Sequence, residues 1–357
     1  MAEIFIINIG STSTRVGMFR NNTPVFTETI NHFSGKIAEL KNFKDWYTFN
    51  LGVVDKILDK YQNKIKDLNL MVSRGGLTRP VKTGAYLINQ SMIDDLTSGR
   101  YGWHPCNTGP VIAREIATRY KTKAIIFDSP VSDEMMPVAR FSGLKGVERC
   151  AAFHVLSHKA AARQAAEDLN ISYNKSSFIV VHMGGGITIC AHKNGRMIDG
   201  THGINEGPFT PQRTGALPLQ EISQLCFSGK YSQKELHQKL FGNGGVASYL
   251  GTHDVKLLEE KITKGDTKAL PVLEAMGYQI SKEIGSMIAV LHGHVDAIII
   301  TGSLSLAKTI MREIQKRISF IAKVLVLPYE DELATLAAGG ISVLNQNEEI
   351  RTYRKEL

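Results

Sequence analysis

The segment IFIINIGSTSTRVGM, at Ile4–Met18, predicts a β-hairpin made of an apolar strand, a turn of small polar residues and a second strand. The segment FIVVHMGGGITICA, at Phe178–Ala191, repeats this layout with a turn of glycines. Aligned without gaps, the two segments match Asn8 with His182, Gly10 with Gly184 and Thr14 with Thr188. One copy opens each half of the chain, so the sequence predicts a duplicated molecule with two similar lobes.

Both turns consist of residues that suit phosphate binding. Gly, Ser and Thr have little bulk, so backbone N–H groups approach a phosphate closely and hydroxyls add further donors. A single turn of this kind is weak evidence, because hairpin turns are often rich in glycine and serine for steric reasons alone. Two copies in one chain favour a protein that closes two lobes around a nucleotide.

Strand-like and helical stretches alternate along the rest of the chain. Apolar residues at helical spacing predict helices over Leu51–Asp67, His154–Leu169 and Leu270–Val290, and Lys123–Phe127 is typical of a buried strand. This alternation predicts an α/β architecture whose sheets are covered by helices on both faces. Asn345–Leu357 has the composition of a polar tail.

The composition and charge favour a globular protein and argue against nucleic-acid and membrane partners. A length of 357 residues suggests about two domains, and 43% apolar with 21% charged residues is typical of a globular chain. The net charge of +8 comes from dispersed basic residues without a nucleic-acid-binding motif, so no nucleic-acid partner is expected. No apolar run reaches the roughly 18 residues of a membrane span, and no signal peptide is recognisable, so no membrane partner is expected. Four scattered cysteines without a CxxC pair fit a reducing cytoplasm.

Two familiar nucleotide motifs are not matched, while three polar residues stand at the ends of apolar strands. The glycines of Met183–Gly186 lack the later glycine of a dinucleotide fingerprint, and the P-loop pattern does not occur. Arg74, Asp128 and His182 each end an apolar run. Ligands bind beyond the carboxyl ends of strands in open α/β sheets, so these residues are candidates for one crevice. Each of them alone could equally be a capping or loop residue.

Further candidates are the imidazoles of His104 and His154 and the guanidinium of Arg213. A loop arginine between Pro and Gly is, taken alone, more often a surface residue. A kinase acting on a carboxylate nevertheless needs fixed positive donors, because the acceptor and the transferring oxygens are all anionic. Phosphoryl transfer needs little covalent chemistry from the protein, so such placement dominates catalysis.

Taken together, the motifs make the chain similar to the acetate kinase family, and within it to the butyrate kinases. That family belongs to the actin/hexokinase/Hsp70-like superfamily, and the resemblance runs essentially end to end. The motifs that carry it are Ile7–Arg15, Ser73–Gly76, Phe127–Asp128, His154–Lys159, His182–Gly186, Asp199–Thr201, Gly207–Gly215 and Glu330–Ala334. Among its departures, Arg15 stands where acetate kinases have lysine, Lys256 where an arginine is usual, and Ser303 where a glycine is usual.

The resemblance implies a role for each matching residue. The implied catalytic residues are Arg74, Asp128, His154 and Arg213. The residues implied to line the substrate and phosphate side are His104, Asn8, Ser11, Ser13 and Arg15. The implied nucleotide-binding residues are His182, Gly184, Gly185, Gly186, Asp254, Gly302 and Ser303. Magnesium would be held by Asn8, Asp331 and Glu332, the last two through water.

The implied function is an ATP-dependent carboxylate kinase that converts butanoate and ATP to butanoyl phosphate and ADP by direct in-line transfer. ATP/ADP and Mg²⁺ are the implied cofactors, and a small carboxylic acid is the substrate. A related kinase for acetate, propionate or isobutyrate is the alternative. A sugar kinase of the same superfamily would instead need one carboxylate as a general base. A nucleotide-gated binding protein would usually carry large insertions or an appended domain.

The expected organisation is a duplicated two-lobe, ribonuclease H-like fold with the active site in the interlobe cleft. Residues 1–130 would form the first lobe, to which a C-terminal helix over 332–357 returns. Residues 131–331 would form the second lobe, which binds the nucleotide. Hinges are expected near Ser129–Glu134 and Tyr329–Glu332, beside prolines. The family resemblance implies a cytoplasmic homodimer that pairs through the second lobe.

Overall fold

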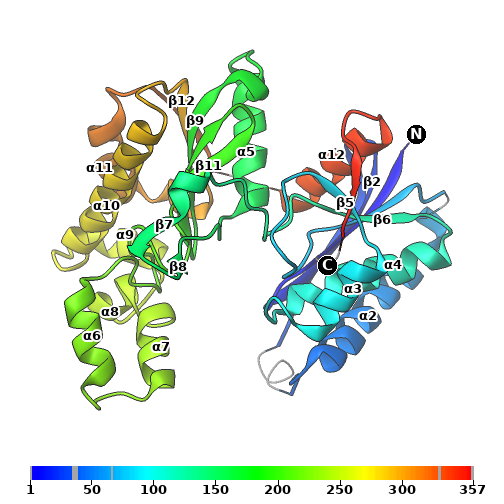
Figure 1. Cartoon of the computed structure of the whole chain (residues 1–357), viewed down its shortest axis with the longest axis horizontal. Helices are drawn as coiled ribbons and strands as arrows, with labels where there is room; N and C mark the ends of the chain where they lie inside the picture. The colour runs from blue at the N-terminus through cyan, green and yellow to red at the C-terminus, as the bar shows by residue number, and fades with distance from the viewer. Residues whose placement is uncertain (1, 34–38, 66, 329–330, 355–357) are drawn as a thin grey trace. The chain divides into compact units, whose positions relative to one another are not determined.

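The structure of the chain is a computed structural model that describes residues 2–33, 39–65, 67–328 and 331–354. The chain divides into two compact units, which are coloured along the sequence in Figure 1. Unit 1 consists of Met1–Ser132 together with Asp331–Leu357, and unit 2 consists of Asp133–Glu330. Tyr329 and Glu330, which belong to the second predicted hinge and to one family motif, lie outside the described residues.

Unit 1 is built on a seven-stranded sheet in the order β14-β5-β6-β4-β1-β2-β3. Its interior strand β1 is mostly apolar and wholly buried, as expected when helices cover both faces. β1 pairs antiparallel with β2 and parallel with β4. The carboxyl ends of β1 and β4 therefore lie at the same edge of the sheet. The strands are β1 (Glu3–Ile9), β2 (Ser13–Arg20), β3 (Thr23–Asn31), β4 (Leu70–Ser73), β5 (Ala85–Leu87), β6 (Lys123–Phe127) and β14 (Ile350–Thr352).

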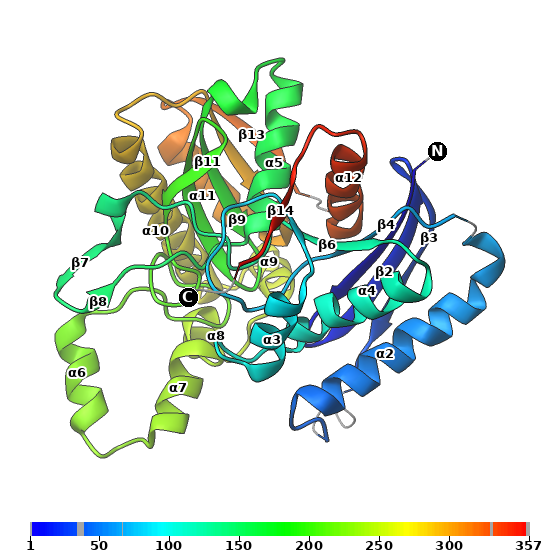
Figure 2. The same cartoon turned by 45° about the vertical axis from the view of Figure 1, so that its right-hand side comes forward.

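Helices pack on both faces of this sheet (Figure 2). They are α2 (Phe43–Lys60), α3 (Gln90–Ser98), α4 (Thr108–Arg119) and α12 (Glu332–Leu344), with short 3₁₀ turns η1 (Gln62–Lys64) and η2 (Pro105–Asn107). Phe5 and Ile7 of β1 point into the core formed with α2, α3 and α4. α12 approaches the sheet closely through Gly340, where a methyl group would lie 2.9 Å from Val72 and 3.0 Å from Ile4.

The sequence placed two features of unit 1 wrongly. The predicted helix over Leu51–Asp67 begins at Phe43, where the Asn42 side chain accepts from the Asp45 N–H, and it ends at Lys60. The predicted C-terminal helix over 332–357 ends at Leu344. Part of the predicted polar tail is strand β14, which pairs with β5, and it is followed by a buried tyrosine, Tyr353.

Unit 2 is built on a five-stranded sheet in the order β11-β10-β9-β12-β13. Its strands are β9 (Ser177–Met183), β10 (Ile187–Lys193), β11 (Arg196–Gly200), β12 (Ala297–Thr301) and β13 (Lys323–Leu327), and a separate hairpin joins β7 (Phe141–Leu144) to β8 (Val147–Glu148). The helices are α5 (Val155–Asp168), α6 (Leu219–Phe227), α7 (Gln233–Phe241), α8 (Gly245–Leu250), α9 (Val255–Thr263), α10 (Ala269–Val290) and α11 (Lys308–Ile318). Its 3₁₀ turns are η3 (Pro137–Arg140), η4 (Tyr173–Lys175) and η5 (Ser303–Leu306).

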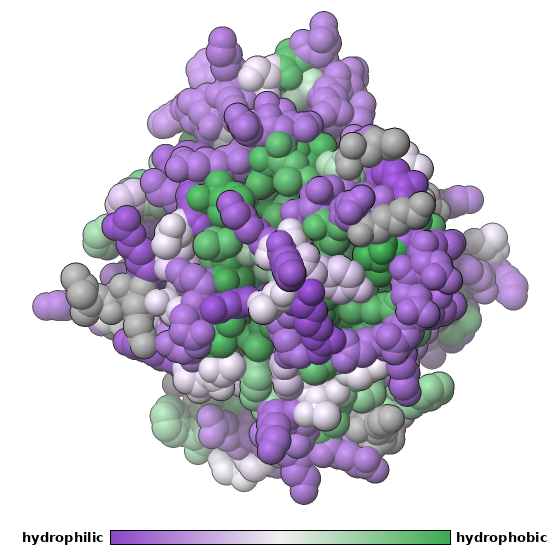
Figure 3. Space-filling model, turned by 90° about the vertical axis from the view of Figure 1, so that its right-hand side faces the viewer, coloured by the Kyte–Doolittle hydropathy of each residue, from purple (hydrophilic) through white to green (hydrophobic). Residues whose placement is uncertain are grey.

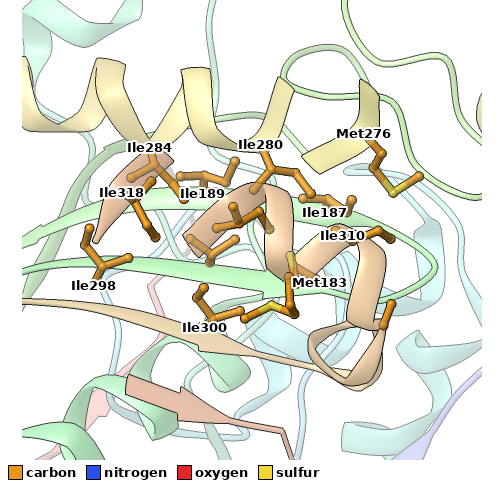
Figure 4. Packing of buried hydrophobic residues seen from close by; sticks show 14 of the residues in the cluster. Met183, Ile187, Ile189, Met276, Ile280, Ile284, Ile298, Ile300, Ile310 and Ile318 are labelled. Atoms are coloured by element: carbon orange, nitrogen blue, oxygen red, sulfur yellow. The ribbon is translucent and has the colours of Figure 1, made fainter. Parts of the chain in front are cut away.

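Alternate residues of the unit 2 strands pack against helices on opposite faces. Ile298 and Ile300 of β12 pack with Ile280 and Ile284 of α10 and with residues of α11 (Figure 4). The intervening Ile299 packs with the alanines of α5 on the other face. This alternation follows from the two-residue period of a strand, and it makes a run of consecutive apolar residues fully buried.

Both predicted hairpins are present, and their pairing corrects the ungapped alignment. In the first hairpin Asn8 pairs with Arg15, and residues 10–13 lie between the last paired residues. In the second, His182 pairs with Thr188, and residues 184–186 lie between the last paired residues. The first turn is therefore one residue longer. Thr188 corresponds in register to Arg15 rather than to Thr14.

The surface seen in Figure 3 is mostly hydrophilic, with smaller hydrophobic areas between the polar residues. Among the described residues, no helix has the length and apolar character needed to cross a membrane.

Candidate functional site

The first group of site residues lies in unit 1 around the carboxylate of Glu332, the first residue of α12. The Asn8 Nδ2 atom donates to Glu332 Oε2 at 2.7 Å. Arg15 Nη1 lies 3.6 Å from Oε2, and Arg74 Nη1 lies 3.4 Å from Oε1. The arginine side chains are 46% and 31% exposed, so these ion pairs add little to stability and both guanidiniums remain accessible to a ligand.

The residues beside Glu332 have structural contacts of their own. Asp331 caps α12, because its Oδ1 accepts from the N–H groups of Leu333 and Ala334 at 3.0 and 3.1 Å. In the β1–β2 turn, the N–H of Gly10 donates to the carbonyl of Ser13 at 2.8 Å, while Ser11 is exposed. The turn therefore holds its shape through its own backbone and presents Ser11 to solvent.

His104 lies near Arg74 and is fixed as a neutral donor. Burial lowers the pKa of His104, and the nearby charge of Arg74 lowers it further. The Nδ1 atom of His104 accepts from the Cys106 N–H at 3.2 Å. A neutral imidazole that accepts through Nδ1 carries its proton on Nε2. Burial also raises the pKa of Cys106 to about 11, so this cysteine remains a thiol.

Asp128 directly follows β6 and is fully buried, with a positive φ of 43°. Its Oδ1 accepts from the Gly84 N–H at 2.9 Å, and its own N–H donates to the Gly84 carbonyl at 3.2 Å. The residue thus joins the end of β6 to the segment before β5. Its implied catalytic role stays a prediction.

The second group lies in unit 2 beside the β9–β10 hairpin. His154 directly precedes α5, and its Nδ1 lies 2.9 Å from Thr188 Oγ1. Its ring stacks on that of His182, with centroids 4.2 Å apart and an interplanar angle of 24°. The two units therefore share a layout, since each places a polar residue at the start of a helix against the paired hairpin residues. In unit 1 this residue is Glu332, and in unit 2 it is His154.

Arg213, in the loop that follows β11, also lies beside the β9–β10 turn. Its Nη1 donates to the Gly203 carbonyl at 2.6 Å, and burial lowers its pKa. A methyl group on Gly186 would lie 2.6 Å from Arg213 Nη1 and 3.3 Å from His154 Nε2. The glycine turn, the guanidinium and the imidazole therefore converge. Thr210 ties the loop to the turn, because its hydroxyl donates to the Gly185 carbonyl at 3.0 Å.

Gly302, which follows β12, packs against the start of the β9–β10 turn. Gly302 has a φ of 88°, and a methyl group there would lie 2.4 Å from the Met183 carbonyl, so only glycine fits. Ser303 follows as the first residue of η5. Asp254 instead caps α9, because its side chain accepts from the Leu257 N–H at 3.0 Å, and its own N–H donates to Thr252 Oγ1 at 3.2 Å.

No role was predicted for Thr188 or His158 from the sequence. Thr188 Oγ1 lies 2.8 Å from His158 Nε2 as well as 2.9 Å from His154 Nδ1. The spacing of His154 and His158 is a signal that could have indicated this, because residues four apart share one face of a helix.

Among the residues that the structure describes, no group of three or more His, Cys, Asp or Glu side chains could hold a metal ion. The amide of Asn8 and the carboxylate of Glu332 are nevertheless oxygen donors of the kind that suit Mg²⁺. This ion usually keeps several waters and is bound by one or two carboxylates together with substrate phosphates. The residues present therefore fit a largely hydrated magnesium ion.

Solved structures share the fold of the whole chain. The acetate kinase of Porphyromonas gingivalis is 18% identical with a TM-score of 0.78, and the match covers 96% of this chain and 100% of that one. A propionate kinase from Francisella tularensis is 17% identical with a TM-score of 0.74, covering 95% and 99%. A ROK family protein from Streptococcus pneumoniae, in complex with sucrose, is 14% identical with a TM-score of 0.52, covering 97% and 99%.

At these identities the likeness shows the fold alone, which is the actin/hexokinase-like α/β fold that the sequence predicted. A model of the acetokinase family matches residues 138–345, which is more than half of the chain. The protein therefore belongs to the acetokinase family.

Proposed function

We propose that the protein transfers a phosphoryl group between ATP and a short-chain carboxylic acid, with butanoate as the preferred acid. Membership of the acetokinase family supports the reaction class. The observation that carries the proposal is the convergence of Arg213, His154 and the glycine turn at Gly186. A fixed cation and an imidazole beside a turn without side chains suit an anionic group that is already ionised.

In the proposed reaction, unit 2 handles the nucleotide and the group in transfer. The backbone of Gly184–Gly186 and Gly302 would receive the phosphates of ATP, with His182, Asp254 and Ser303 as the further predicted nucleotide contacts. Arg213 and His154 would donate to the oxygens of the transferring phosphoryl group. Such donors lower the barrier because negative charge on those oxygens is stabilised by groups that are already in place.

In unit 1, Arg74, Arg15 and His104 would hold the carboxylate or acyl-phosphate oxygens, and Ser11 and Ser13 would add hydroxyl donors. Asn8, Asp331 and Glu332 would hold Mg²⁺, the acidic pair through water. The ion would neutralise part of the charge on the ATP phosphates. Asp128 would act indirectly, through the geometry of the strand end that it fixes.

Several further features belong to this proposal. The protein would work in the cytoplasm, as a homodimer that pairs through unit 2. The location of the reaction in an interlobe cleft stays a prediction. A preference for acetate, propionate or isobutyrate is the alternative to butanoate, and the family match is compatible with each of them.

The test is a hydroxylamine-trapping assay with ATP, Mg²⁺ and a series of straight and branched acids, with glucose as the control acceptor. Acyl hydroxamate should form with short-chain acids, and kcat/KM should be highest for butanoate. ADP release with glucose but with none of the acids would overturn the reaction class. A maximum at acetate or propionate would retain the reaction class and overturn the choice of acid.

A further inference from the structure

A continuous line of hydrogen-bonding groups runs from His154 into the interior of unit 2. Thr188 Oγ1 lies 2.9 Å from His154 Nδ1 and 2.8 Å from His158 Nε2. His158 Nδ1 lies 3.4 Å from His192 Nε2. His192 Nδ1 in turn lies 2.8 Å from the hydroxyl of Tyr173. Five side chains, from α5 and the residue before it, η4 and β10, are thus linked end to end.

The interior members of this line are held neutral. Thr188, His158 and His192 are all 0% exposed. Burial lowers the pKa of His158 and of His192 well below the usual value, so each ring carries one N–H at neutral pH. A neutral imidazole donates through one nitrogen and accepts through the other.

With His154 neutral as well, only two arrangements satisfy every link, because Thr188 has a single hydroxyl proton. If Thr188 donates to His154 Nδ1, all three histidines carry their proton on Nε2, and Tyr173 donates to His192. If Thr188 instead donates to His158 Nε2, the three histidines carry their proton on Nδ1. The line therefore has two states, and the protonated nitrogen of His154 reports which state is present.

Charges at the inner end favour the first state. Lys159 Nζ lies 5.6 Å from the centre of the Tyr173 ring and is paired with the buried Glu134 carboxylate at 2.8 Å. At His192 the positive charges outweigh that carboxylate, because Lys159 and Arg163 both lower the pKa of this histidine. Positive charge there favours N–H and O–H bonds that point away from it, toward His154. Arg213 acts in the opposite sense at the outer end, where its Nη1 is held by the Gly203 carbonyl at 2.6 Å.

We propose that Thr188, His158, His192 and Tyr173 form a hydrogen-bonded relay that fixes His154 with its proton on Nε2. That nitrogen faces Gly186, so His154 is presented as a donor toward the glycine turn. The four relay members are positioning residues, since they act through His154. The target of the donor, the transferring phosphoryl group, rests on the proposed function, whereas the tautomer does not.

The direct test reads the tautomers in the protein without substrate. In ¹⁵N-histidine-labelled protein, long-range ¹H–¹⁵N spectra distinguish an Nε2–H ring from an Nδ1–H ring. His154, His158 and His192 should all be Nε2–H, each assigned by its replacement with glutamine. An Nδ1–H ring at His154, or three rings in mixed states, would overturn the relay.

Two variants of one side chain separate positioning from packing. Thr188→Val keeps the volume but removes the hydroxyl, so the His154 signals should change to a mixture of tautomers. It should also lower kcat by roughly 10–100-fold, as outer hydrogen-bond partners of functional histidines do, with KM for ATP little changed. Thr188→Ser keeps the hydroxyl and should restore the spectrum and most of kcat. Equal effects of the two substitutions would contradict the relay.

Tyr173→Phe tests the far end at a half-buried position, should Thr188→Val fail to fold. It should shift the His192 and His158 signals and lower kcat less than Thr188→Val does. Unchanged histidine signals would contradict the relay. Nε2–H tautomers in a protein without carboxylate kinase activity would support the relay and overturn only the proposed function.

Discussion

Gly186→Ala is a test of the geometry on which the proposed reaction depends. The added methyl group would lie 2.6 Å from Arg213 Nη1, 3.1 Å from His154 Cε1 and 3.3 Å from His154 Nε2. To reach the 3.4 Å of ordinary contact, the guanidinium must move by about 0.8 Å. A misplacement of about 1 Å costs roughly 10²-fold in rate, so kcat should fall about 100-fold, or ~2.7 kcal/mol in the barrier.

The substitution should affect the fold much less than the rate. Gly186 does not have the positive φ that strains other residues, and the atom that must move most is the far end of a flexible side chain. Gly285→Ala is the matched control, because this glycine is exposed within α10 and a methyl group there would meet no atom within 4 Å. It should raise the free energy of unfolding by about 0.5–1 kcal/mol and leave kcat unchanged.

The assay is steady-state ADP release with butanoate and ATP, together with a thermal melt of each variant. A Gly186→Ala variant that turns over at the wild-type rate would refute the convergence of Arg213 and His154 on this turn. A large drop in melting temperature would show instead that the loss of rate comes from the fold.

Three further perturbations have defined outcomes. Arg213→Ala should lower kcat on the order of 10³-fold while the Kd for ATP, measured by calorimetry, changes little; near-normal turnover would contradict its role. His158 and His192 are neutral when buried but bind protons when unfolded, so below about pH 6.5 the free energy of unfolding should fall by about 1.4 kcal/mol per pH unit for each. Melts that are independent of pH between about 8 and 5.5 would argue against this. Tyr353→Phe should cost about 1–3 kcal/mol in urea unfolding, because the tyrosine hydroxyl donates to the buried Asp95 carboxylate at 2.7 Å; an unchanged midpoint would exclude this contribution.

The hairpins and buried strands were predictable because their signals are local. An apolar run such as Lys123–Phe127 is bounded by polar residues, and β6 occupies those residues. The register of the two hairpins was not predictable by matching letters. A turn with one extra residue shifts every later residue by one position. In a strand, a shift of one position moves each side chain to the opposite face of the sheet. Only the pairing shows that Thr188 corresponds in register to Arg15 and not to Thr14.

The C-terminal segment was missed for a different reason. Strand β14 has only three residues and a polar composition, so it carries no periodic signal. Its formation depends on pairing with β5, which is more than 260 residues away in sequence. The relay histidines were missed likewise, because His158 and His192 are brought together by the packing of α5 on the sheet. Sequence patterns report the local period of a segment, and such contacts are set by tertiary structure.

The discontinuity of unit 1 has a consequence for the order in which a ribosome-bound chain can fold. The residues of unit 2 form one uninterrupted stretch, so its sheet can be complete before the second segment of unit 1 is made. The segment of unit 1 that precedes unit 2 emerges before it, but this segment lacks α12, which covers one face of the sheet, and β14, which pairs with β5, until the residues that follow unit 2 are made. Its exposed sheet face and unpaired strand edge must therefore wait through the synthesis of some two hundred residues of unit 2. The earlier-made half of the enzyme is thus the later one to finish folding, and it is the half that a nascent-chain chaperone would need to protect.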